Sequence, residues 1–188
     1  MTPLALVAFT IAMVFGFMLA EQRLSRVNEQ RLRAAGAIEP AGDPWRALAI
    51  LYPAAFLAMG VEGAWHAMHA APAGPAAWTP SWGASGLVLF MASKALKYWA
   101  IGSLGERWSF SVLVEPGRPL VTSGPYRYVS HPNYIAVAGE LVGTAMMMAS
   151  FIAGPVMTGA FGVALWSRVK VEERALGSAR STKRLDAS

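Results

Sequence analysis

Residues 124–134 read GPYRYVSHPNY, and this stretch holds the densest group of polar and helix-defining residues in the chain. One histidine, one arginine, three tyrosines and two prolines fall within it. Gly124-Pro125 is typical of a turn. Pro132 ends any helix before it and suits the first turn of a helix that begins there. We therefore predict a polar loop leading into a helix, whose free N–H groups form an anion site.

The rest of the chain is unusually apolar. It has 188 residues, of which 55% are hydrophobic and only 14% are charged, and its mean hydropathy is +0.39. Soluble domains carry about 25% charged residues. Because the shortfall is concentrated in long apolar runs, the composition indicates a polytopic membrane protein. The absence of cysteine excludes disulfides, a thiolate nucleophile and cysteine metal sites.

Five apolar segments predict an all-α, polytopic membrane helix bundle of about five transmembrane helices, since a span needs about 20 apolar residues. The first lacks the basic flank and cleavage site of a signal peptide, so a retained span is favoured. The last two are short and closely linked, which predicts a helical hairpin with tilt or local bilayer thinning. The segments cover residues 4–20, 45–68, 84–102, 133–149 and 151–167.

The connecting segments differ in polarity. Residues 21–35 predict a short amphipathic helix at the membrane surface. Residues 70–83 carry no charge and predict a tight connection at the opposite face, with Trp78 and Trp82 in an aromatic belt. At the end of the third span, Lys94 and Lys97 are expected to extend their ammonium groups to the surface.

Lysine and arginine residues alternate between the two sides of the predicted bundle. Of the sixteen, five lie in residues 21–46, between the first span and the start of the second, five at the end of the third span and in the loop after it, and six after the fifth span. Basic residues accumulate on the cytoplasmic side of membrane proteins. The pattern predicts an external N-terminus, with the polar loop and the C-terminus in the cytoplasm. The membrane that we expect is a bacterial inner membrane.

Several ionisable residues leave two interpretations open. Arg168 and Glu172 share one face of a continued fifth helix, either as a surface ion pair or as ligands of a substrate and a cofactor. His131 is either a hydrogen-bonded turn residue or a functional group. Glu62 and Glu140 lie inside predicted spans, where carboxylates usually face the interior and have a partner. No metal site is predicted.

Five short motifs, taken together and in this order, resemble the isoprenylcysteine carboxyl methyltransferase family. The resemblance covers about the last 85 residues and implies a membrane-embedded methyltransferase that uses S-adenosylmethionine. It departs from the family at Ser130, where an arginine is usual, and after Leu176. The motifs are LGERWS at 104–109, RPLV at 118–121, GPYRY at 124–128, HPNY at 131–134 and EERAL at 172–176.

The resemblance also assigns site residues and a domain organisation. We expect a single domain over residues 1–188, with three spans in 1–102 from the apolar segments and, as the resemblance implies, a cofactor-binding catalytic core in 103–188. Arg168 matches the arginine near the methyl acceptor. The positions that match cofactor-contacting residues are Arg118, Pro119, Leu120, Val121, Tyr126, His131, Pro132, Asn133, Tyr134 and Glu172.

The expected reaction is methyl transfer to an oxygen of a lipophilic or lipidated acceptor in the membrane. The family's small bacterial-type relatives imply acceptors such as the hydroxyl groups of long-chain polyketide lipids. A hydroxyl acceptor needs a general base, for which Glu140, Glu172 and His131 are candidates. Two alternatives stay open: a phospholipid N-methyltransferase, and a non-catalytic membrane protein that binds a partner, or a haem through His131 with His66 or His69. A nucleic-acid partner is not expected.

Overall fold

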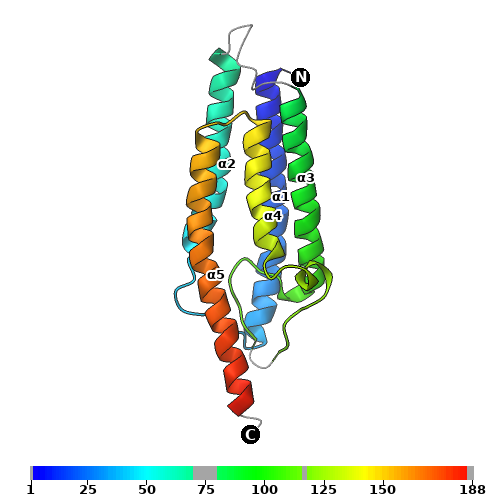
Figure 1. Cartoon of the computed structure of the whole chain (residues 1–188), viewed down its shortest axis with the longest axis vertical. Helices are drawn as coiled ribbons and strands as arrows, with labels where there is room; N and C mark the ends of the chain where they lie inside the picture. Colours follow the sequence, from blue (N-terminus) through cyan, green and yellow to red (C-terminus); the bar gives the residue numbers. More distant parts are fainter. Residues whose placement is uncertain (1, 70–79, 116–117, 186–188) are drawn as a thin grey trace.

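Five helices run side by side along one axis in the computed structural model, which describes residues 2–69, 80–115 and 118–185 (Figure 1). Among these residues, extended pairing is limited to one isolated bridge between Ile38 and Val114. The predicted all-α bundle is therefore confirmed. The elements are α1 (Pro3–Ala34), α2 (Trp45–His69), α3 (Pro80–Leu104), the 3₁₀ turns η2 (Gly105–Arg107) and η3 (Gly124–Arg127), α4 (Pro132–Met147) and α5 (Ala153–Leu185).

The outside of the bundle is suited to lipid. Within the described residues, α1, α2 and α3 are long and apolar enough to cross a membrane. α4 has 16 residues, a length of about 24 Å, which is shorter than the roughly 30 Å hydrocarbon core. Large apolar side chains such as Val61, Val88 and Val163 are exposed. The chain is thus an integral membrane protein in which three helices meet the spanning criterion and two are shorter or more polar.

Two predicted boundaries are wrong. The surface helix expected at residues 21–35 is the continuation of α1, which stays helical to Ala34 because residues 17–35 contain no Gly or Pro. The third span begins at Pro80 and includes Trp82, four residues before the expected start at Ala84. The rest of the predicted connection, with Trp78, lies outside the described residues.

The closest helix contact joins α3 to α4 through glycines. A Cβ atom on Gly86 would lie 2.7 Å from the carbonyl oxygen of Gly143, and one on Gly143 would lie 2.8 Å from the backbone nitrogen of Phe90. A Cβ atom on Gly139 would collide with the Ser93 hydroxyl. Small residues spaced in this way let membrane helices approach closely. The position of α4 against α3 therefore depends on the absence of side chains at these sites.

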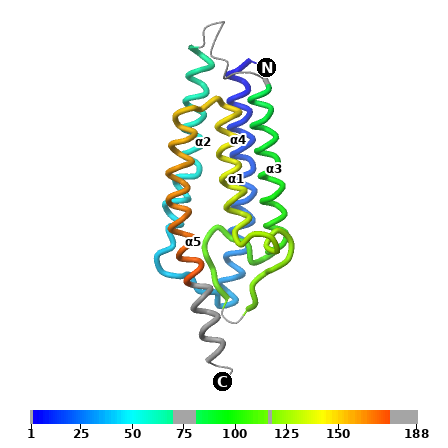
Figure 2. The backbone as a smooth tube through the Cα atoms, in the orientation of Figure 1, coloured from blue at the N-terminus to red at the C-terminus, as the bar shows by residue number. Residues whose placement is uncertain are grey.

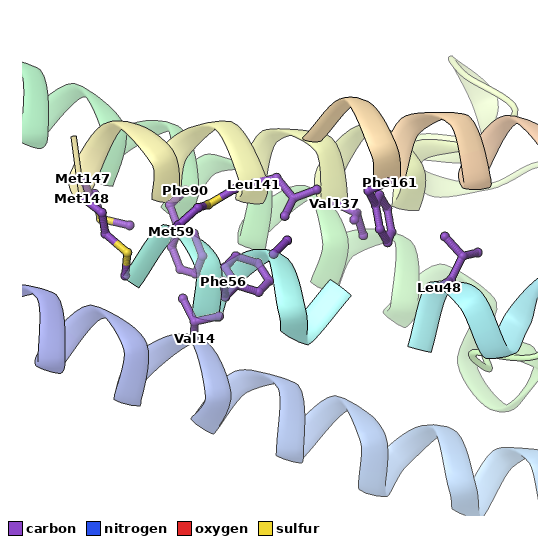
Figure 3. Close-up of a cluster of buried hydrophobic side chains, with 11 residues drawn as sticks. Val14, Leu48, Phe56, Met59, Phe90, Val137, Leu141, Met147, Met148 and Phe161 are labelled. Carbon is purple, nitrogen blue, oxygen red and sulfur yellow. The ribbon is translucent and has the colours of Figure 1, made fainter. Parts of the chain in front are cut away.

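The apolar core lies between the helices (Figure 3). Phe56 and Met59 of α2 pack with Phe90 of α3, Leu141 of α4 and Met148 after α4, and all five are fully buried. Because the outer surface is also apolar, the hydrophobic effect alone does not distinguish core from surface here. Specific packing and polar contacts must define the arrangement.

A buried group of charges, which we call the intramembrane cluster, joins four helices. It consists of Glu21 of α1, Tyr52 of α2, Lys94 and Lys97 of α3, and Glu140 of α4. The lysine ammonium groups lie 2.7 and 2.6 Å from the Glu21 carboxylate and 3.1 and 3.4 Å from that of Glu140. Tyr52 donates a hydrogen bond to Glu140. The four charged residues are at most 2% exposed.

The expectation that Lys94 and Lys97 reach the surface is therefore wrong. Their side chains point inward because two carboxylates on other helices neutralise them, which removes most of the penalty for burying an ammonium group. At the opposite end of the bundle, a carboxylate binds backbone N–H groups at the start of a helix. Glu62 accepts hydrogen bonds from the backbone of Phe151, Ile152 and Ala153 at the start of α5, so it caps that helix.

Candidate active site

The polar loop between α3 and α4 folds over one end of the bundle, where α1 and α3 end and α4 begins (Figure 2). The last turns of α1 hold it there. The Asn28 side chain donates to the carbonyl of Trp108 at 2.8 Å. The Ser25 hydroxyl accepts from the backbone N–H of Phe110 at 2.8 Å. The long α1 thus supplies hydrogen-bond partners for one residue of the motif at 104–109 and for the residue directly after it.

The turn η3 closes against the end of α3. Gly124 has a φ of +60°, and a Cβ atom there would collide with the hydroxyl of Ser103. Glycine is required for both reasons. The turn places Tyr126 partly inside the protein, where burial raises the pKa of its phenol and the Glu172 carboxylate raises that pKa further. Tyr126 therefore lies within electrostatic reach of Glu172.

The centre of the site is a hydrogen-bonded chain of three residues from α4 and α5. The Tyr134 hydroxyl donates to Glu172 at 2.5 Å and accepts from Nε of Arg168 at 3.1 Å. Arg168 and Glu172 are four residues apart on α5, so one helix face presents both to Tyr134. The tyrosine separates the two charges, which do not form a direct salt bridge. We call these residues the Tyr134 triad.

His131 lies beside the triad. Its ring stacks on that of Tyr134, with centroids 5.3 Å apart. Nδ1 is 3.9 Å from Glu172, and Nε2 is 3.5 Å from Glu173. The loop and the C-terminal helix therefore meet, as the sequence predicts. His66 and His69 lie at the far end of α2, at the other end of the bundle (Figure 1).

Arg168 is the most enclosed member of the triad, at 6% exposure. It donates a hydrogen bond to the carbonyl of Phe110. Its guanidinium carbon lies 5.9 Å from the ring of Trp45, and Nε is 3.9 Å from the carboxylate of Asp43. Sequence analysis did not identify Asp43 or Trp45, because Asp43 lies in the connection before α2 and Trp45 is the first residue of α2, both far from every motif.

The residues near the triad suit the polar groups of S-adenosylmethionine. Glu172 is 26% exposed and accepts from a single side chain among the described residues. The Oδ1 atom of Asn133 is buried and has no hydrogen-bond partner within the described chain. His131, the residue before α4, makes no side-chain cap. Pro132 has no N–H, and the N–H groups of Tyr134 and Ile135 donate to the His131 carbonyl, so the first turn leaves the N–H of Asn133 for an anion. Glu172 therefore suits a ligand group that donates hydrogen bonds, such as an ammonium or a hydroxyl, and the start of α4 suits a carboxylate.

Other predicted residues lie away from the triad. Arg118, Pro119 and Leu120 are exposed; Arg118 pairs with Glu115 at 2.5 Å, and Pro119 accepts from Arg107 at 2.7 Å. Within the described residues, neither they nor Val121 hydrogen-bond to the triad through an identified contact. Pro132 is buried at the start of α4. Glu140 belongs to the intramembrane cluster, six residues or roughly 9 Å along α4 from Tyr134.

Taken together, the apolar helices and the charged site define an integral membrane protein with a polar centre at one end of its bundle. Residues 86–178 match the model of the isoprenylcysteine carboxyl methyltransferase (ICMT) family, and this part of the chain belongs to that family. The family resemblance is thus confirmed, and the match supports a membrane methyltransferase of this type.

A relative supports homology over most of the chain. The uncharacterised protein YpbQ of Bacillus subtilis (strain 168) is 29% identical over 157 residues. The similar region covers 84% of this chain and 88% of YpbQ. The similarity therefore extends into the N-terminal helices, beyond the region that the family model matches.

Proposed function

We propose that the protein transfers a methyl group from S-adenosylmethionine to an oxygen atom of a lipophilic, membrane-borne acceptor. The observation that carries this proposal is the contact of His131 and Tyr134, at the start of α4, with Arg168 and Glu172 on α5. His131 and Tyr134 belong to one family motif and Glu172 to another, Arg168 lies four residues before Glu172, and the four residues form one connected group. Methyl transfer requires the charged donor and the oxygen acceptor to bind next to each other, so the site must contain residues that bind each of them.

Glu172 and the start of α4 would hold the donor. The Glu172 carboxylate accepts hydrogen bonds from hydroxyl or ammonium groups, and the backbone N–H of Asn133, in the first turn of α4, would donate to a carboxylate. The stacked rings of His131 and Tyr134 and the ring of Tyr126 favour a cation by cation–π attraction. When bound, S-adenosylmethionine supplies an electrophilic methyl group on a positively charged sulfur.

Arg168 would bind the acceptor oxygen. It is buried and held at Nε and one terminal nitrogen, so its charge acts in a medium of low dielectric constant. A shallow apolar groove on the outer side of α5, lined by Gly162, Leu165, Trp166 and Val169, flanks this position along the helix. A lipid chain in that groove would bring its polar end toward Arg168 from the bilayer.

The kind of acceptor decides which further residues are needed. A carboxylate needs no base, and positioning and exclusion of water would supply most of the acceleration. A hydroxyl needs a base, and His131 and Glu172 are already at the site. Glu140 can act only on an acceptor that reaches the intramembrane cluster, where both of its oxygens lie near lysines. We therefore favour His131 or Glu172 for this role.

We also propose that the site faces the cytoplasm. The described arginines of the α1 extension and of the loop lie at the same end as the triad (Figure 1), and such residues mark the cytoplasmic side. A reporter fused after Ser188 should be active only if it is a cytoplasmic reporter. Activity of a periplasmic reporter at that position would contradict this orientation.

Cofactor binding tests the site. Purified protein in detergent should bind S-adenosylhomocysteine, and Glu172→Ala should reduce the affinity at least about 100-fold, because a charged hydrogen-bond partner is lost. Tyr134→Phe should weaken binding by about 10-fold. Glu106→Gln is the matched control, since Glu106 lies at the same end and is 75% exposed in its side chain. Unchanged binding in both site variants would refute the assignment.

The acceptor class is tested with labelled donor. Methyl-labelled S-adenosylmethionine, given to membranes that contain the protein, should place label in lipid esters or ethers. Label in derivatives of phosphatidylethanolamine would instead identify an N-methyltransferase. Glu140→Gln should leave transfer by the folded protein intact if the base lies at the triad, and a loss of transfer with cofactor binding retained would assign the base to Glu140.

A further inference from the structure

The connection between α1 and α2 reaches the Tyr134 triad from a part of the chain that the family model does not match. Asp43 and Trp45 lie before residue 86, where the match begins. Both approach Arg168, the carboxylate at 3.9 Å and the indole ring at 5.9 Å. The surroundings of Arg168 are therefore shared between the family region and the N-terminal helices.

Asp43 is buried and only half satisfied. Its side chain is 2% exposed. One carboxylate oxygen, Oδ2, accepts from the backbone N–H of Val112 at 3.1 Å. The other, Oδ1, has no hydrogen-bond partner among the described residues and faces Arg168. A buried carboxylate that hydrogen-bonds only one peptide group needs a compensating charge, and Arg168 supplies it.

Arg168 in turn needs a counter-ion. Its other partners, the Phe110 carbonyl and the Tyr134 hydroxyl, are neutral. The rings of Trp45 and Phe110 stack with centroids 5.4 Å apart, and they exclude water from one side of the guanidinium. Glu172 is reached only through Tyr134. Among the described residues, the negatively charged group within ion-pair distance of Arg168 is the carboxylate of Asp43.

We propose that Asp43 is a positioning residue that fixes the guanidinium of Arg168 for the acceptor oxygen. This inference rests on the proposed function, because it assumes that Arg168 binds the acceptor. Asp43 is itself held by the loop at Val112, so it sets the distance between α5 and the loop as well as the direction of the Arg168 side chain. It touches neither the donor nor the acceptor.

The test separates positioning from binding and from folding. Transfer from methyl-labelled S-adenosylmethionine is measured with palmitic acid and with 3-pentadecylphenol in detergent micelles. Asp43→Asn, which keeps the shape and an acceptor for Val112, should lower kcat on the order of 10- to 100-fold, since small displacements of a catalytic group have such effects. The affinity for S-adenosylhomocysteine should change less than about 2-fold. Asp43→Glu should recover part of the rate.

The matched control is Glu39→Gln. Glu39 belongs to the same connection and pairs with Arg33 at 2.5 Å, away from the triad. Its loss should leave kcat and the binding of S-adenosylhomocysteine unchanged. A kcat for Asp43→Asn equal to that of Glu39→Gln would overturn the proposal.

A double-mutant cycle shows whether Asp43 acts through Arg168. In an Arg168→Lys background the guanidinium is gone, so Asp43→Asn should lower kcat by no more than about 3-fold further, because effects of coupled residues do not add. Equal losses in both backgrounds would overturn the proposal. So would a parallel loss of cofactor binding, which would give Asp43 a purely structural role.

The proposed function fails in a different way. Wild-type protein that binds no S-adenosylhomocysteine, or transfers no methyl group to either probe, would overturn the function and this inference together. Wild-type transfer with an unaffected Asp43→Asn overturns the inference alone. If Asp43→Asn does not accumulate, Asp43→Glu carries the same test, since it keeps the charge and displaces it by one methylene.

Discussion

The intramembrane cluster and the Tyr134 triad contain the same chemical groups, arranged for opposite purposes. Each has carboxylates, cations and a tyrosine hydroxyl. In the cluster, each carboxylate meets two lysines, and the charged side chains are at most 3% exposed. At the triad, the side chains of Glu172 and of the neighbouring His131 are 26% and 22% exposed, and the Oδ1 atoms of Asn133 and Asp43 have no hydrogen-bond partner among the described residues. A closed, charge-balanced network holds helices together, whereas an open one can exchange its partners for a ligand.

This comparison explains why two intramembrane lysines do not mark a second site. Two positive and two negative charges leave the cluster neutral, and it lies between four helices that have few other polar contacts. A buried ion network of this kind is retained for specificity of packing more than for net stability. The triad lacks such balance around Glu172, because Glu173 and His131 add further ionisable groups at the water-facing end.

The largest expected effect comes from opening the cluster. Lys97→Met leaves buried carboxylates with one lysine between them, and the free energy of unfolding should fall by about 3–5 kcal/mol. Thermal unfolding in detergent measures this loss, with exposed Lys170→Met as the control. Glu21→Gln added to Lys97→Met restores neutrality and should recover part of the stability. If Lys97→Met alone were as stable as wild type, the cluster would not be holding the helices together.

A smaller effect is expected from separating α3 and α4. In Gly143→Ala the new Cβ atom meets backbone atoms of Gly86 and Phe90 at 2.8 Å, so the helices must move apart. The free energy of unfolding should fall by about 1–3 kcal/mol. Gly159→Ala is the control, since nothing lies within 4 Å of its Cβ position. The affinity for S-adenosylhomocysteine should persist, because Tyr134 is held by α5. A parallel loss of affinity would show that the cluster and the triad are one unit.

The smallest effect concerns pH and the triad's neighbour Tyr126. Burial raises the pKa of this phenol above its ordinary value of 10, and Glu172 raises it further. A raised native pKa gives stability that is complete below the unfolded value near 10 and is lost as the pH rises through the native value. Above pH 10, the unfolding midpoint of wild type should fall by about 1–3 °C more than that of Tyr126→Phe. Identical pH dependence would place Tyr126 in solvent.

Much of this architecture could be predicted from local patterns. Apolar runs longer than a bilayer requires predict helices wherever they occur, because backbone groups in lipid must bond within their own segment. Pro132 predicts the start of α4 for a steric reason that involves only its neighbours. The four-residue spacing of Arg168 and Glu172 predicts a shared face, and the continuous α5 confirms it.

The errors share a cause. The prediction for Lys94 and Lys97 used the average behaviour of lysines at helix ends, which holds when no partner is available. Glu21 is 73 residues from Lys94 along the chain, so no local pattern reveals the pair. The α1 extension was assigned to the membrane surface by its charges, but Ser25 and Asn28 face the loop instead. The outcome in each case depends on which distant segment packs alongside.

The amino-acid sequence by itself determined a helical membrane protein with a polar loop at one end and the family motifs of a methyltransferase, because these properties follow from apolar length, proline and short-range spacing. Only the tertiary structure decided which charges are neutralised in the bundle and which remain open to a ligand. Electrostatic and hydrogen-bond energies depend on the distance between atoms. For Asp43 beside Arg168, and for Glu21 and Glu140 between the two lysines, packing of the helices sets that distance.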